Sequence, residues 1–167
     1  MIEEGTGFYA VPSSVKVVVL AAGNAGGKVL LGLNGRGEWE LPGGWPDKQD
    51  VSLSDTAARE VLEESGIVLD NDPVLVGAEL FSPVPGRQVT LVCLATRLDT
   101  AETPTPSSEH KDVRWFGVDA LPSNLPAVYR GFIESAASRM LTREDLHRAN
   151  ELVRDVLDED FMSRGWN

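Results

Sequence analysis

Residues 52–65 predict a helix with three glutamates on one face, and no other segment constrains the fold as strongly. At about 100° per residue, the carboxylates of Glu60, Glu63 and Glu64 fall within about 100° of arc. The other side carries apolar residues that we expect to face the core, namely Ala58, Val61 and Leu62. Carboxylates this close repel one another unless a cation lies among them. The helix therefore predicts either a site for a bound cation or a solvated acidic surface.

Strand-like segments surround this helix, whose ends are marked by Ser52 as an N-cap and Gly66 as a C-terminal stop. Apolar residues at helical spacing predict two further helices, over 124–140 and about 142–161. Runs of β-branched and aliphatic residues predict strands over 15–22, 28–33, 38–41, 73–82, 88–97 and 113–117. The fold class is therefore α/β, a sheet covered by helices, with amphipathic helices at the C-terminal end.

The length of 167 residues fits one domain over residues 1–167. A formal net charge of −11 excludes a protein that holds a nucleic-acid polymer or an anionic membrane through its surface charge. The single cysteine, Cys93, excludes an internal disulfide and is expected to be a buried structural thiol. No apolar run approaches the roughly 20 residues of a membrane-spanning helix, and residues 1–10 do not resemble a secretory signal. We expect a cytoplasmic protein.

The glutamates favour a particular kind of cation. Hard oxygen ligands that converge on one point suit Mg²⁺, with Mn²⁺ as a substitute, rather than Zn²⁺. The Gly43-Gly44 turn upstream lets the backbone approach whatever the carboxylates hold, because glycine has no Cβ. Arg59 lies one helical turn before Glu63 and can pair with it, which fixes the glutamate rotamer.

Gly44 and the run Arg59-Glu60-Val61-Leu62-Glu63-Glu64-Ser65-Gly66-Ile67 carry the pattern of a known family. The sequence resembles the Nudix hydrolases, the MutT-like diphosphate hydrolases. The resemblance implies a Nudix-type α/β/α sandwich with a mixed β-sheet, in which residues 44–67 form a signature loop and helix. It also implies Mg²⁺-dependent cleavage of a nucleoside diphosphate linked to another moiety, such as a nucleotide, a sugar or an ADP-ribose-like group. The residues implied in catalysis or metal binding are Gly44, Arg59, Glu60, Glu63 and Glu64.

One departure from the family pattern lies in the signature loop, which is one residue longer than usual. Counting forward from Gly44 puts Asp50 where the first signature Glu belongs, whereas counting back from Arg59 puts Val51 there. Neither residue is Glu. Because loss of signature acids is typical of modules that no longer hydrolyse, a non-hydrolysing nucleotide-binding or sensor module is the alternative function.

A further carboxylate is expected from a later loop. The resemblance implies that, in some relatives, this acid lies six residues before a Trp that starts the last strand. Glu109 has that relation to Trp115. Glu109 is therefore a candidate catalytic and metal-binding residue, or an ordinary loop acid. Glu60 and Glu109 are both candidates for the general base. His110 can orient a water or a phosphate, or have no role in the site.

Substrate-binding residues are predicted less directly. Arg36 and Arg87 lie on turns beside the predicted sheet, where each either meets a phosphate or is an ordinary surface arginine. Trp45 and Phe81 are candidate platforms for a nucleobase, although Phe81 is equally suited to the core. Trp39 is interpreted as core packing or a loop anchor.

The expected partner is a small-molecule nucleoside diphosphate derivative. Pro83 lies sixteen residues after Ile67, a spacing that marks the ADP-ribose-cleaving branch of the family, although a turn explains the proline equally well. The amphipathic helix over about 142–161 is a candidate surface for a homodimer.

Overall fold

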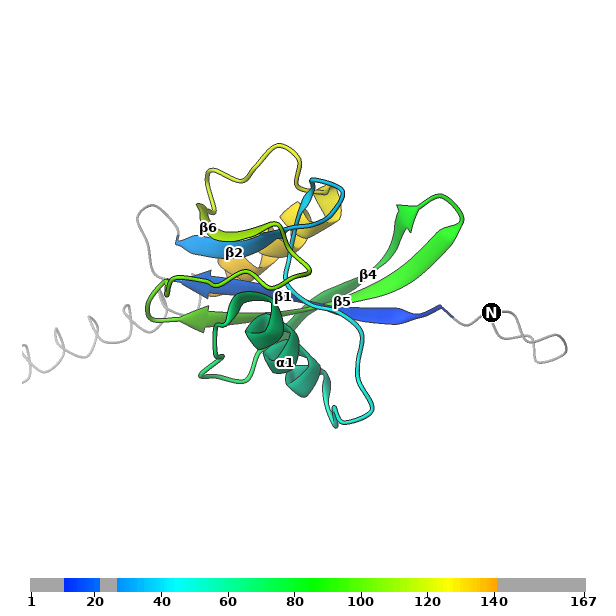
Figure 1. Cartoon of the computed structure of the whole chain (residues 1–167), viewed down its shortest axis with the longest axis horizontal. Coiled ribbons are helices and arrows are strands. Elements are labelled where there is room, and N and C mark those ends of the chain that lie inside the picture. The colour runs from blue at the N-terminus through cyan, green and yellow to red at the C-terminus, as the bar shows by residue number, and fades with distance from the viewer. Residues whose placement is uncertain (1–10, 22–26, 141–167) are drawn as a thin grey trace, which may run out of the picture.

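A computed structural model of the chain describes residues 11–21 and 27–140 (Figure 1). Its strands are β1 (Ser13–Ala21), β2 (Lys28–Leu33), β3 (Trp39–Glu40), β4 (Val74–Val84), β5 (Arg87–Leu98) and β6 (Asp112–Gly117). Helix α1 covers Leu53–Ser65, and residues 127–140 form a second helix. All six predicted strands and both of these helices are therefore confirmed, with ends that differ by a few residues. The helix predicted over about 142–161 lies outside the described residues.

The strands form one mixed sheet in the order β3-β2-β1-β5-β4, and β6 also pairs with β2. β1 and β5 run parallel along the whole of β1, from Ser13 opposite Thr90 to Ala21 opposite Leu98. The other pairs are antiparallel. Within the described residues, no helix is long and apolar enough to cross a membrane.

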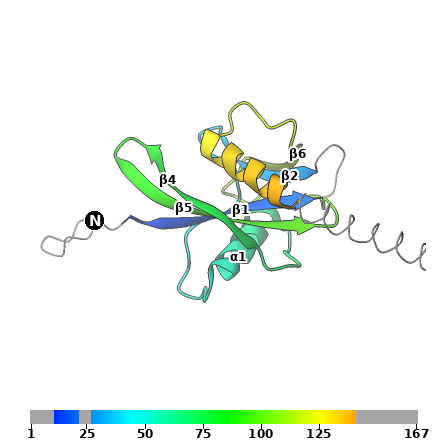
Figure 2. The same cartoon turned by 180° about the vertical axis from the view of Figure 1, so that it is seen from behind.

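The sheet is the middle layer of a sandwich, because α1 covers one face and the helix over 127–140 covers the other (Figures 1 and 2). Alternate residues of β1 explain this arrangement. Val15, Val17 and Val19 pack in the same cluster as residues of α1, whereas Val18 and Leu20 pack in the cluster of the second helix. Cys93 is a buried free thiol in that second cluster. The α/β/α sandwich expected from the sequence is confirmed.

Helix α1 begins and ends as the sequence predicts, but part of its predicted core face is wrong. The Ser52 side chain accepts a hydrogen bond from the Asp55 N–H, and Gly66 adopts φ 72° at the C-cap. Val61 is fully buried, as expected, whereas Ala58 is exposed and Leu62 is 48% exposed. The glutamates Glu60 and Glu64 are buried instead. The inward orientation of these carboxylates is favoured by the Gly43 N–H, which donates to Glu64, and by the absence of a Cβ at Gly44, which leaves space for Glu60.

Candidate active site

The floor of the site is the turn over residues 42–44, which is bonded to the edge of β1. Val17 N–H donates to the Pro42 carbonyl at 2.9 Å, and Val15 N–H donates to the Gly44 carbonyl at 2.8 Å. Gly43 has φ 134°, and a Cβ on this residue would lie 2.2 Å from the Val15 carbonyl oxygen. Only glycine fits there, because a side chain would meet the backbone of β1.

Lys16 holds this turn from within the protein. Its ammonium group donates to the carbonyl oxygens of Leu41 at 3.1 Å and Gly43 at 2.9 Å, and the residue is only 8% exposed. A buried charge is tolerated only when it is well hydrogen-bonded and compensated. The sequence did not single out Lys16, because one lysine in a strand of valines carries no motif.

Two glutamates of α1 reach the turn. Gly43 N–H donates to Glu64 Oε2 at 3.0 Å, and a Cβ on Gly44 would lie 2.6 Å from Glu60 Oε1. The two glycines thus make the space that these carboxylates occupy. Burial raises the pKa of Glu64 to about 7, although the nearby Lys16 ammonium opposes the shift.

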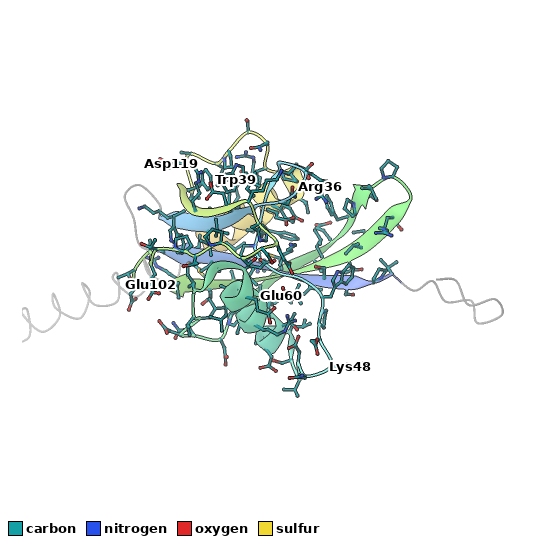
Figure 3. All side chains as sticks on the ribbon, viewed as in Figure 1. Arg36, Trp39, Lys48, Glu60, Glu102 and Asp119 are labelled. Atoms are coloured by element: carbon teal, nitrogen blue, oxygen red, sulfur yellow. The ribbon has the colours of Figure 1, made fainter. Side chains whose placement is uncertain are left out.

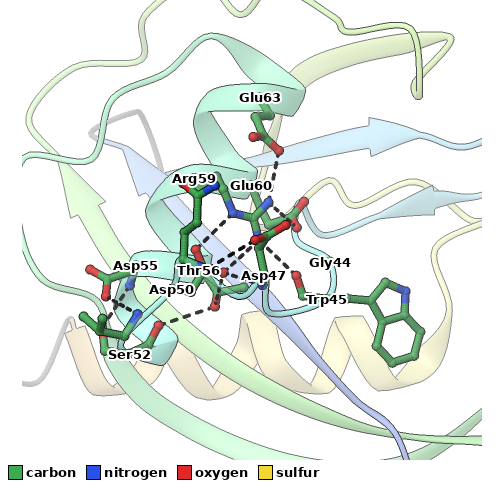
Figure 4. Close-up of polar contacts among 12 residues, drawn as sticks. Gly44, Trp45, Asp47, Asp50, Ser52, Asp55, Thr56, Arg59, Glu60 and Glu63 are labelled. Atoms are coloured by element: carbon green, nitrogen blue, oxygen red, sulfur yellow. Dashed lines mark hydrogen bonds and ion pairs between the residues drawn. The ribbon is translucent and has the colours of Figure 1, made fainter.

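Arg59 is the centre of the charged network (Figure 4). Its Nη1 donates to Glu60 Oε1 at 2.8 Å and to Glu63 Oε2 at 3.1 Å, so the predicted pair with Glu63 is confirmed. Its Nη2 donates to the Trp45 carbonyl at 2.9 Å. One guanidinium therefore connects the signature helix to the loop that precedes it.

The structure distinguishes the two positions that counting left open for the first signature acid. Asp50 Oδ1 accepts from Arg59 Nε at 3.1 Å, and Oδ2 accepts from Arg59 Nη2 and Thr56 Oγ1, each at 2.9 Å. These hydrogen bonds, led by those from Arg59, hold the pKa of Asp50 well below its usual range. Val51 is 94% exposed. Asp50 is thus the acid that pairs with the signature arginine.

His110 and Glu40 form a second buried pair nearby. His110 Nε2 lies 3.2 Å from Glu40 Oε1, and the histidine side chain is 3% exposed. Its ring rests on Gly32, where a Cβ would lie 2.5 Å from His110 Cδ2. The hydrogen bond with Glu40 raises the pKa of His110, against the effect of burial. Asn34 donates to the other oxygen of Glu40 at 3.4 Å.

The glycine turn, Arg59 with the glutamates of α1, and the Glu40–His110 pair line an acidic cleft of about 460 Å³. Its wall holds six carboxylate side chains against one arginine and one histidine. The predicted residues that it brings together are Gly44, Trp45, Arg59, Glu60, Glu63, Glu64 and Glu109. Glu40 and Asp47 also line the cleft, and the sequence missed both. The signal for Glu40 was its position just before the Leu41–Gly44 segment.

Two other predicted residues line a second hollow, of about 430 Å³, that shares no lining residue with the acidic cleft. It contains Arg36, which is paired with Glu38 at 2.8 Å, and Phe81, whose ring lies 5.9 Å from that of Tyr129. Arg36 lies well away from Glu60 (Figure 3). Arg87 lies at the start of β5 and lines neither hollow.

Trp39 packs in the core, which is one of the two roles that the sequence left open for it. It is 8% exposed, and its ring centroid lies 4.6 Å from that of Phe116 in an edge-to-face contact. Such pairs contribute about 1 kcal/mol beyond the burial of their area.

The donor set of the cleft fits a hard divalent cation, because carboxylate oxygens predominate and no thiolate takes part. In the described residues, however, no three acidic, histidine or cysteine side chains converge closely enough to form a ready-made metal site. Glu60 and Glu63 turn toward Arg59 instead. The Gly44 carbonyl accepts hydrogen bonds from Val15 N–H and the Ser14 hydroxyl, so it is the least available of the predicted ligands.

Comparisons with known proteins agree with this architecture. The NUDIX domain of Shewanella oneidensis NrtR, in a structure with ADP ribose, is 21% identical, with a TM-score of 0.67 over 83% of this chain and 94% of that one. A MutT protein from Methanosarcina mazei Go1 is 26% identical, with a TM-score of 0.61 over 80% of this chain and 98% of that one. An Ap4A hydrolase from C. elegans is 15% identical, with a TM-score of 0.67 over 79% and 99% of the two chains.

A search of curated proteins finds no match. A family model described as NUDIX domain matches residues 12–136, which include the whole sheet, α1 and both hollows. The chain belongs to the NUDIX domain family.

Proposed function

We propose that the chain is a Mg²⁺-dependent pyrophosphohydrolase that cleaves a nucleoside diphosphate linked to another moiety. The observation that carries this proposal is the acidic cleft in which Arg59 bonds Asp50, Glu60 and Glu63 beside a double glycine. Members of the NUDIX family are generally hydrolases that use divalent metals, which supports the same reaction here.

In this proposal the glutamates of α1 hold the cation. Glu63 and Glu64 are its ligands together with Glu60, and Glu109 adds a carboxylate from the loop before β6. Mg²⁺, when bound, supplies positive charge to the phosphate oxygens. Glu63 suits this role because it is the most exposed of the three, with a side-chain exposure of 59% and one bond to Arg59. Glu64 keeps its second oxygen free of described hydrogen bonds while Oε2 is held by Gly43.

The proton taken from the attacking water goes to a carboxylate at the cleft wall, either Glu60 or Glu109. Arg59 acts on Glu60 as a positioning residue, because it donates to Oε1 at 2.8 Å and is itself fixed by Asp50. Buried Lys16 compensates the negative charge behind the turn without lining the cleft.

The rest of the substrate is proposed to lie toward the second hollow. That hollow offers the apolar side chain of Phe81 together with the polar groups of Arg36 and Asn124. Asn34 lines this hollow and donates to Glu40 of the acidic cleft, so the two hollows meet at one hydrogen bond. The ADP ribose in the Shewanella structure supports a nucleoside diphosphate derivative as the class of ligand.

The alternative is a nucleotide-binding or sensor module that does not hydrolyse. The change of the first signature Glu favours it, whereas the Asp50–Arg59 pair favours the hydrolase because it preserves the support of Glu60. A homodimer, a cytoplasmic location and a single domain over residues 1–167 stay predictions.

A substrate screen separates the two functions. Nucleotides, nucleotide-sugars and ADP-ribose are incubated with the full chain and Mg²⁺ or Mn²⁺, and phosphate is measured after coupling to a phosphatase. The hydrolase predicts turnover that disappears with chelator. Tight nucleotide binding without turnover of any compound would establish the sensor function instead.

A further inference from the structure

Lys16 reaches the glycine turn from the face of the sheet opposite α1. On β1 it shares a face with Val18 and Leu20, which pack in the cluster of the second helix. Its ammonium lies 5.9 Å from the centroid of the Tyr129 ring in that helix. Glu64 reaches the turn from α1, which covers the other face (Figures 1 and 2). Two side chains of opposite charge therefore bond the turn from opposite faces of the sheet.

The ammonium completes the bonding of the turn to β1. Backbone N–H groups of β1 donate to the carbonyls of Pro42 and Gly44. The alternate carbonyls, those of Leu41 and Gly43, both accept from Lys16 Nζ. Because the N–H groups of a strand alternate between its edges, residue 16 reaches this segment through its side chain rather than its backbone. A buried carbonyl without a partner is costly, and here the lysine supplies that partner twice.

The bond from Lys16 to Gly43 has a further effect, because the carbonyl it holds belongs to a peptide between two glycines. Rotation of the Gly43–Gly44 peptide is not restricted by a Cβ on either side, so its hydrogen bonds fix its orientation. Gly43 lines the acidic cleft, and its N–H donates to Glu64 Oε2 at 3.0 Å. The ammonium keeps the carbonyl oxygen away from the carboxylates, whose negative charge repels it, and leaves the N–H directed at Glu64.

We propose that Lys16 is a positioning residue for the reaction, which holds Gly43 in the orientation that fixes Glu64 as a cation ligand. Lys16 acts through the turn, since it does not line the cleft. The inference rests on the proposed function for the role of Glu64. It also accounts for a buried ammonium among the valines of β1, where an apolar residue would avoid the cost of burying a charge.

Mn²⁺ binding to the full chain separates positioning from a role of charge alone, because the two predict opposite signs. Lys16→Met removes the ammonium and keeps a side chain of similar length. Loss of the charge alone would tighten Mn²⁺ binding, since one cation near the site repels another. Loss of the fixed turn is expected to weaken Mn²⁺ binding about tenfold, the usual effect of removing a group that orients a metal ligand. Equal or tighter binding, measured by calorimetry, would overturn the inference.

Two further variants complete the comparison. Lys111→Met is the matched control, because Lys111 also donates to a turn carbonyl, that of Gly35 at 3.0 Å, and lines neither hollow. Its Mn²⁺ affinity is expected to equal that of the wild type. Lys16→Gln removes the charge but keeps an N–H donor, and it replaces Lys16→Met if that variant does not fold. It is expected to bind Mn²⁺ about threefold more weakly than the wild type, and equal or tighter binding would overturn the inference.

Kinetics provide a second readout. In Lys16→Met with saturating Mn²⁺, kcat is expected to fall about tenfold and KM to change less than about twofold, since Lys16 lines neither hollow. Weaker Mn²⁺ binding in Lys16→Met, with no hydrolysis by the wild type, would refute the proposed function and support the inference. Hydrolysis by the wild type, with unchanged kcat and Mn²⁺ affinity in Lys16→Met, would do the reverse. Absence of Mn²⁺ binding by the wild type would refute both.

Discussion

Asp50 accepts hydrogen bonds from both Nε and Nη2 of Arg59, at 3.1 and 2.9 Å. This two-point contact fixes the plane of the guanidinium, because both donors are held by one carboxylate. Arg59 in turn donates to Glu60 and Glu63 from Nη1. Asp50 has a shorter side chain than the usual glutamate and lies in a signature loop that is one residue longer. It nevertheless bonds the same arginine that Glu60 and Glu63 contact.

Removing the Asp50 carboxylate should weaken catalysis through Arg59. In Asp50→Ala, kcat is expected to fall by roughly 10- to 100-fold, the usual effect of losing a group that orients the residues touching the ligand. Val51→Ala is the matched control, since Val51 is 94% exposed and is the other position that counting allows. Steady-state kinetics of both variants make the comparison. Wild-type turnover in Asp50→Ala would show that the pair has no role in the reaction.

The raised pKa of Glu64 predicts how stability depends on pH. The folded protein binds a proton at Glu64 up to about pH 7, whereas the unfolded chain releases it near 4.5. Between these values the folded state holds more protons, so the free energy of unfolding falls as pH rises, by about 3 kcal/mol for this group. Glu64→Gln does not titrate and keeps the shape of the side chain. We expect it to lose less stability than the wild type between pH 5 and pH 8.

Urea denaturation of both proteins in chelator, at pH 5 and pH 8, measures this difference. For each protein, the free energy of unfolding at pH 8 is subtracted from its value at pH 5. The other titrating groups contribute equally to this difference in both proteins, so they cancel when the two differences are compared. A wild-type loss equal to that of Glu64→Gln would refute the raised pKa. Glu64→Gln is also expected to abolish turnover, because it removes a proposed cation ligand. Glu64 would then serve the reaction while its buried carboxylate lowers the free energy of unfolding at neutral pH.

Gly43 in the 42–44 turn and Gly86 between β4 and β5 both have positive φ, but a Cβ is expected to cost them different amounts of stability. Gly43→Ala should destabilise the protein by roughly 3 kcal/mol or more, because it combines positive φ with a clash against the β1 backbone. Gly86→Ala is the control, with φ 79° and open space around its Cβ, and should cost only about 1–2 kcal/mol. Thermal and urea denaturation measure both. Similar stabilities in the two variants would contradict the close approach of Gly43 to β1.

Glu109 is tested by Glu109→Gln, which keeps the shape of the side chain and removes its charge. If it is the general base or a metal ligand, kcat should fall by about 100-fold or more. Asp119→Asn, in the loop after β6 and outside the residues that line either hollow, is the control for loss of one carboxylate. Unchanged turnover in Glu109→Gln would assign the base to Glu60.

The parts of the site that the sequence predicted lie close together along the chain. Arg59, Glu60, Glu63 and Glu64 share one helix, so their spacing alone places them near one another. The direction in which that helix faces was predicted only in part, because Ala58 and Leu62 are exposed while Glu60 and Glu64 are buried. Hydrophobicity favoured the apolar pair, whereas the Gly43 N–H that bonds Glu64 and the space at Gly44 beside Glu60 favour the observed orientation.

The parts that the sequence missed come from segments far apart in the chain. Lys16 on β1 and Glu40 on β3 reach the site through strand pairing. No motif marks Lys16, and the position of Glu40 just before the Leu41–Gly44 segment is its only local signal. Arg36 and Phe81 were candidate substrate-binding residues, and they line the second hollow, which meets the acidic cleft at the Asn34–Glu40 hydrogen bond. Strand order, and with it the placement of these residues, requires the three-dimensional structure.

Cation-dependent hydrolysis is tested most directly by the turnover of the best nucleoside diphosphate substrate, measured for the wild type and Glu63→Gln, each in Mg²⁺ and in chelator. Glu63 is the most accessible carboxylate of the signature helix, so its loss should remove a cation ligand without disturbing the core. Cation binding by Glu63 predicts Mg²⁺-dependent hydrolysis by the wild type and a loss of about 100-fold or more in Glu63→Gln. Hydrolysis that persists in chelator, or an equal rate in Glu63→Gln, would contradict it.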